Sequence, residues 1–152
     1  MRILILLSLM FLFSCDSENG ILIIPIEEDF SAIENPRERW DAYKLSDYKI
    51  TQQRVCECLG IEYSVYVFNN SILESIYESK STKESDKFVS KNAITVNEAF
   101  DLIEEYESKA HSISVNYHPQ FGYPTKLLID IHEMIADEEI IYRMSNLEKI
   151  KR

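Results

Sequence analysis

Apolar and polar side chains alternate along much of this chain, as they do in half-buried strands. Six segments have this alternation, or a short apolar run, and are predicted to be strands: 47–55, 61–68, 71–77, 113–117, 126–131 and 138–144. Asn69 and Asn70 tolerate positive φ, so the pair predicts a tight turn between the second and third strands. The pattern therefore predicts mostly antiparallel pairing.

Two other segments have features of helices. Asn35 followed by Pro36 predicts the start of a short helix over 34–45. Residues 95–98 match a capping box, and apolar positions at helical spacing follow over 99–110. Strands and helices in this order predict an α+β fold, with a single antiparallel sheet and two helices packed on one face.

The remaining segments set the domain limits. Residues 21–26 are apolar, but Pro25 restricts them to an edge strand or an extended strap. The Ser/Lys/Glu-rich residues 78–92 lack periodicity and predict a surface loop. We expect one α+β domain over 35–145 and a frayed C-terminal tail over 146–152.

The N-terminus resembles a bacterial lipoprotein signal peptide. Arg2 precedes an apolar run over 3–13, which is too short to span a membrane but has the length of a signal-peptide core. A leucine three residues before Cys15, with Ser14 immediately before it, is typical of the site where a lipoprotein is cleaved and acylated. We expect residues 1–14 to be removed and Cys15 to carry lipid, followed by a tether and strap over 15–34. An ordinary secretory signal with an incidental cysteine is the alternative.

This prediction sets the location and the first partner. An acylated Cys15 would hold the chain on a lipid bilayer of the bacterial cell envelope, facing the periplasm or the exterior. The chain has 16 basic and 26 acidic residues, a net charge of −10. Nucleic acid is an unsuitable partner for such a chain, and anionic lipid headgroups should also repel the domain, so we expect it to stand off the membrane on its anchor.

Cys56 and Cys58 are the other two cysteines, separated by Glu57. On a flat strand their Cα atoms would lie about 6.6–6.8 Å apart, near the upper limit for a disulfide, and a bulge at Glu57 would shorten the gap. An oxidising compartment favours a disulfide, while free thiols and metal ligation stay open. Zinc needs two further ligands, and no pair of histidines stands at helical spacing among His111, His118 and His132.

Two other segments could contact ligands. The turn ending in Tyr123 and Pro124 is predicted to be structural, although an exposed tyrosine and proline would suit a protein partner. An acidic cluster could bind calcium or supply an Asp130–Glu138 acid/base pair, but a solvated acidic edge is the simpler interpretation. The cluster contains Asp130, Glu133, Asp137, Glu138 and Glu139. We predict no catalytic residues, no metal and no cofactor.

Several short motifs, taken in order, resemble a family of uncharacterised bacterial secreted proteins and lipoproteins. The resemblance runs from about Trp40 to Tyr142. Asn69-Asn70 and His118 depart from the family pattern. The motifs are Trp40, Tyr48, Cys56-Glu57-Cys58, Val65-Tyr66-Val67, Phe100, Val115, Tyr117, Gly122-Tyr123-Pro124-Thr125, Asp130 and Asp137-Glu138-Glu139. The resemblance implies an envelope location and a small α+β fold, but no reaction.

Two classes of function follow. The first is a non-catalytic binding or assembly module, which presents a sheet face or a turn to another envelope component. The second is a small redox helper or enzyme that uses Cys56 and Cys58. The absence of a catalytic motif favours the first.

Overall fold

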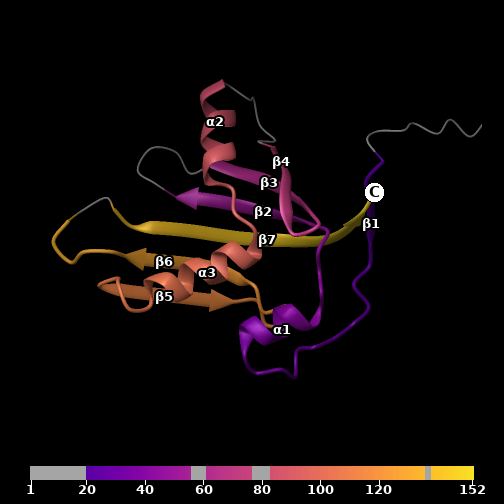
Figure 1. The fold of residues 1–152 in the computed structure, drawn as a ribbon, viewed down its shortest axis with the longest axis horizontal. Coiled ribbons are helices and arrows are strands. Elements are labelled where there is room, and N and C mark those ends of the chain that lie inside the picture. The colour runs from indigo at the N-terminus through magenta and orange to yellow at the C-terminus, as the bar shows by residue number, and fades with distance from the viewer. Residues whose placement is uncertain (1–19, 56–60, 77–82, 136–137) are drawn as a thin grey trace, which may run out of the picture.

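The computed structural model describes residues 20–55, 61–76, 83–135 and 138–152. Its main feature is a seven-stranded antiparallel sheet with strand order β4-β3-β2-β7-β6-β5, in which β1 pairs with β7 (Figure 1). The strands are β1 (Leu22–Ile24), β2 (Tyr48–Val55), β3 (Ile61–Phe68), β4 (Ser71–Ile76), β5 (Ser112–Tyr117), β6 (Pro124–Asp130) and β7 (Ile140–Lys151). The predicted α+β fold is confirmed.

The three helices are α1 (Pro36–Ala42), α2 (Lys83–Asn92) and α3 (Val96–Tyr106). In Figure 1, α3 lies in front of β5 and β6, α2 stands next to β3 and β4, and α1 lies at the lower edge of the sheet; buried residues of all three helices join one core. Asn35 caps α1 by accepting a hydrogen bond from the Glu38 amide, and Thr95 and Glu98 form the predicted capping box of α3. Alternate strand residues point to one face of the sheet and form the core with the helices, among them Tyr48, Ile50, Tyr63, Val65, Leu127, Ile129, Tyr142 and Met144.

The prediction of a surface loop over 78–92 is wrong for residues 83–92, which form α2. Val89 is fully buried in this helix, and Phe88 packs partly against the core. Two apolar positions in a Ser/Lys/Glu-rich segment are too few to show a helical period. Tertiary packing therefore stabilises a helix that the sequence pattern does not reveal.

The prediction of a frayed tail over 146–152 is also wrong, because β7 continues to Lys151. A bulge between β2 and β7 lets the strand continue: Lys49 pairs with Glu148 and Thr51 with Ser145. Asn146 adopts the positive φ, 52°, that such a bulge requires. The last residues of β7 then pair with β1, which is the edge strand that Pro25 predicted.

Candidate functional site

No helix of the described residues covers the face of the sheet opposite α1, α2 and α3, which we call the uncovered face. Side chains that alternate with the core residues point to this face, including Lys49, Thr51, Tyr66 and Arg143. An antiparallel sheet often leaves one face to solvent, so exposure alone does not define a site. The shape and chemistry of this face are more informative.

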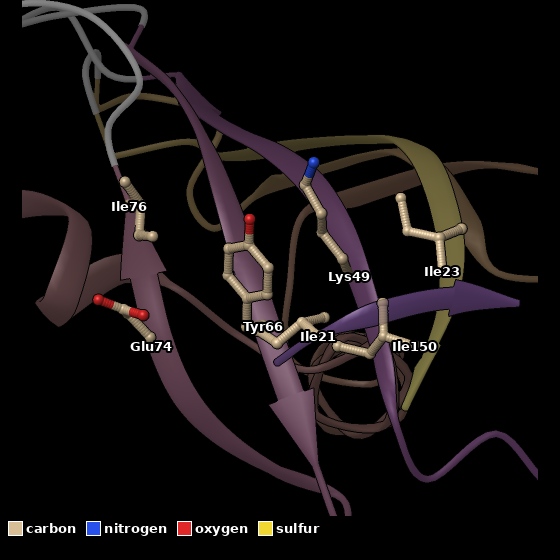
Figure 2. Close-up of a pocket in the computed structure, with 7 residues that line it drawn as sticks. All are labelled: Ile21, Ile23, Lys49, Tyr66, Glu74, Ile76 and Ile150. Carbon is tan, nitrogen blue, oxygen red and sulfur yellow. The ribbon is translucent and has the colours of Figure 1, made fainter. Parts of the chain in front are cut away.

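An apolar groove of about 240 Å³ crosses one end of the uncovered face (Figure 2). Its lining comes from the segment around β1 and from four strands of the sheet: Ile21, Ile23, Lys49, Tyr66, Glu74, Ile76 and Ile150. Ile150 is 2% exposed yet is not part of the core beneath the helices; it lies opposite Ile23 of β1 and lines the groove with it. The groove thus depends on β1, which forms one of its walls.

The polar groups of the groove form a row across four strands. Register places Lys49 opposite both Glu148 and Tyr66, and Tyr66 opposite Glu74. Lys49 Nζ lies 3.5 Å from Glu148 Oε2 and 5.8 Å from the centre of the Tyr66 ring. Glu148 Oε2 makes no hydrogen bond to a described residue, so the ion pair is its main stabilising contact. Lys49 is therefore neutralised, and Glu74 is the exposed charge of the groove.

A polar hollow of about 330 Å³ is lined partly by the neighbouring residues of the same face. Arg143 Nη1 donates to Gln53 Oε1 at 3.5 Å inside this hollow. The hollow is lined by Thr51, Gln52, Gln53, Glu62, Thr125, Arg143, Met144 and Ser145. The uncovered face therefore presents an aliphatic end and a polar end side by side.

Tyr123 and Pro124 do not lie on the surface, as the possible partner contact at this turn would require, which agrees with the structural role predicted for the turn. Tyr123 is 3% exposed, and the Pro124 side chain is fully buried. The ring of Tyr123 stacks on His118 at 5.0 Å and meets Trp40 edge-on at 6.4 Å. Burial raises the pKa of Tyr123 to about 12. The turn is therefore part of the core.

His118 and Arg39 hold this turn in place. His118 Nδ1 accepts hydrogen bonds from the amides of Gln120 and Phe121, and burial lowers the His118 pKa. Arg39 Nη1 donates to the carbonyl oxygen of Pro119 at 2.6 Å, and its Nε donates to that of Ile33 at 2.7 Å. Arg39 thus joins the turn to the segment before α1.

A second buried polar cluster was not predicted from the sequence. Gln52 is 0% exposed, and its amide pairs with both the N–H and the carbonyl oxygen of Ile94. The hydroxyls of Tyr63 and Tyr142 donate to the carbonyl oxygen of Asn92, at 3.2 and 3.0 Å. These bonds fix the junction between α2 and α3. A glutamine at a core-facing position of β2 was the available clue.

Other predicted site residues lie outside the described residues or remain apart. Cys15, Cys56 and Cys58 lie outside the described residues, as does Asp137. Among the described residues, including those of the acidic cluster, no three His, Cys, Asp or Glu side chains lie close enough together to hold a metal ion. No helix in the described ranges is long and apolar enough to cross a membrane.

The fold and the site define a small α+β domain with one sheet face packed under helices and one face open. The chain belongs to a family of unknown function, DUF6174, whose model matches residues 32–149. This match spans the helices and all strands except β1 and the last residues of β7. Comparison with curated proteins and with solved structures finds no match.

Proposed function

We propose that this protein is a bacterial envelope lipoprotein, anchored through Cys15, whose domain is a non-catalytic binding module. The main supporting observation is the groove on the uncovered sheet face, with its aliphatic walls and one exposed carboxylate at Glu74. Such a groove suits a partner protein that offers an aliphatic side chain next to a basic one. The net charge of −10 would also attract a basic partner.

The anchor is tested on the full chain extracted from membranes. Mass spectrometry should find residues 1–14 removed and an acyl mass on Cys15, and Cys15→Ser should release the protein from the membrane fraction. An unmodified, soluble chain that begins elsewhere would contradict the anchor.

The binding face is tested by photo-crosslinking in cells. A photoreactive residue at Ile76, on the rim of the groove, should give a discrete adduct with one envelope protein, and Glu74→Lys should reduce its yield. Met134, which is 93% exposed and outside the groove, is the control position. The same adducts from both positions, or none from Ile76, would contradict binding at this face.

A further inference from the structure

We propose that the corner of the domain formed by β1 and the end of β7 docks on an anionic lipid surface, which presupposes the Cys15 anchor proposed above. This β1–β7 corner comprises residues 21–24 and 149–152. Gly20 leads into it, and the C-terminus ends in it, so both ends of the described chain meet there (Figure 1).

The composition of the corner differs from that of the rest of the chain. Its eight residues read ILII and KIKR, with no acidic side chain, whereas the whole chain has 26 acidic and 16 basic residues. Leu22 and Ile23 are 63% and 64% exposed, and Lys151 and Arg152 are exposed. Exposed aliphatic side chains beside basic ones are the combination that surface-bound membrane segments use.

Pairing between the strands brings the two kinds of side chain together. Leu22 lies opposite Lys151, and Ile24 lies opposite Lys149. Directly opposed residues share a face of the sheet, so Leu22 and Ile24 each have a basic neighbour, whereas Ile23 lies opposite Ile150. The lysine ammonium groups could then lie among the lipid headgroups while the aliphatic side chains reach the edge of the hydrocarbon region.

The acidic groups around the corner leave its basic residues uncompensated. Glu74 is exposed in the groove that Ile21 and Ile23 also line, but it stands on β4, three strand spacings of about 4.8 Å from β7. Glu148 faces Lys49, at 3.5 Å, and Asp47 accepts a hydrogen bond from the Asn69 amide at 2.7 Å. Glu27 and Glu28 follow only after Pro25. Charges are screened over about 8 Å at physiological ionic strength. The positive charge of the corner therefore affects a nearby lipid surface more than the negative charge of distant parts of the domain does.

The anchor would keep the corner close to the bilayer. Five peptide units separate Cys15 from Gly20, which limits the distance between their Cα atoms to about 18 Å. So short a tether gives the corner a high effective concentration at the lipid surface. The exposed Glu133 and Glu139, near the start of β7, would then point away from the membrane, since β7 has 12 residues and spans roughly 35–40 Å.

Tryptophan fluorescence of the lipidated full chain tests the docking. The wild-type chain has one tryptophan, Trp40, which is 3% exposed and serves as the background. In vesicles that contain brominated phosphatidylglycerol, Leu22→Trp should lose most of its added emission, and Met134→Trp should keep it. Lys151→Glu combined with Arg152→Glu should weaken the quenching. We expect the partition coefficient onto the vesicles to fall roughly fivefold for each basic residue removed. Lys87→Glu with Lys91→Glu, the same charge change on exposed positions of α2, should leave it unchanged.

Each result decides between distinct interpretations. Acylated, vesicle-bound protein with an unquenched Leu22→Trp would overturn the docking and leave the anchor in place. Absence of an acyl group would instead contradict the anchor. Quenching that is equal in phosphatidylcholine vesicles, or unaffected by charge reversal at the corner, would overturn recognition of anionic lipid. Protection of Leu22 and Lys151, which do not line the groove, by an envelope protein in place of lipid would likewise overturn the proposal.

Discussion

Gly122 has a φ of +81° beside the carbonyl oxygen of Pro36, and a Cβ at this position would overlap that oxygen. The same Cβ would lie 3.1 Å from Arg39 Cβ. Only glycine therefore lets the turn approach α1 so closely. Single residues of this kind fix how the turn and α1 pack, although neither is part of the uncovered face.

We predict that Gly122→Ala lowers the free energy of unfolding by at least about 2 kcal/mol, because it adds a steric clash to an unfavourable φ. Gly20→Ala is the matched control. Gly20 also has a positive φ, +47°, but a Cβ there would meet nothing within 4 Å, so we expect a loss of about 1 kcal/mol or less. Urea unfolding of both variants measures the difference. Equal losses would show that the contact with Pro36 is unimportant.

We predict that His118 makes the stability of the domain fall on acidification. Burial lowers the folded-state pKa of His118 below its value in the unfolded chain, so the unfolded state binds more protons. The stabilisation is present above about pH 6.5 and is lost as the pH falls through and below that value. Unfolding between pH 7 and 5 should show a smaller decline in His118→Asn, whose side-chain oxygen can still accept from the turn. An identical decline would assign the effect to other groups.

At the scale of elements, β7 determines the architecture more than any other strand. It pairs with β2 along most of its length, with β6 over its first residues and with β1 over its last. The bulge at Asn146 keeps Met144 in the core and turns Ile150 to the opposite face. The groove exists because this last part of the strand is ordered and covered by β1.

Deletion of residues 149–152 should therefore destabilise the domain. It removes the partners of β1 and the buried Ile150 side chain, and we expect a loss of about 2–4 kcal/mol. Deletion of Arg152 alone is the control; it removes only the contact of an exposed guanidinium with the Phe68 ring, 4.6 Å from its centre, and should cost no more than about 1 kcal/mol. Thermal unfolding followed by circular dichroism measures both. An unchanged melting temperature after the larger deletion would mean that the β1–β7 pairing contributes nothing.

At the scale of the whole molecule, the separation of faces is the main property. The helices pack on one face of the sheet, and the groove lies on the opposite face. The β1–β7 corner forms an edge of the sheet: Ile23 and Ile150 point to the groove, and Leu22 and Lys151 point to the other face. In the arrangement that we propose, Leu22 and Lys151 would contact the membrane, and the part of the groove lined by Lys49, Tyr66 and Glu74 would face a partner anchored in the same membrane.

The proposed export of the protein predicts the state of its cysteines. If the chain is an envelope lipoprotein, Cys56 and Cys58 should form a disulfide in protein purified from the envelope, because acylation would consume Cys15 and the compartment would be oxidising. Replacing both with serine should cost only about 1–2 kcal/mol, since so short a loop removes little entropy from the unfolded chain. Alkylation of the unfolded, unreduced protein measures the pairing. Label on both residues without reductant would favour free thiols, metal ligation or a redox role.

The sequence by itself determined the local features of this protein. Alternation of apolar residues, the caps at Asn35 and Thr95 and the Asn69-Asn70 turn predicted most elements and the fold class, because these depend on neighbouring residues. The local pattern of apolar residues does not indicate which distant segments pair with one another. Only the tertiary structure could therefore show α2 as a helix, bury Tyr123, extend β7 past its bulge and bring residues 21–24 against 149–152. The groove needs side chains from five strands or their flanks, and only strand order and register decide which of them meet.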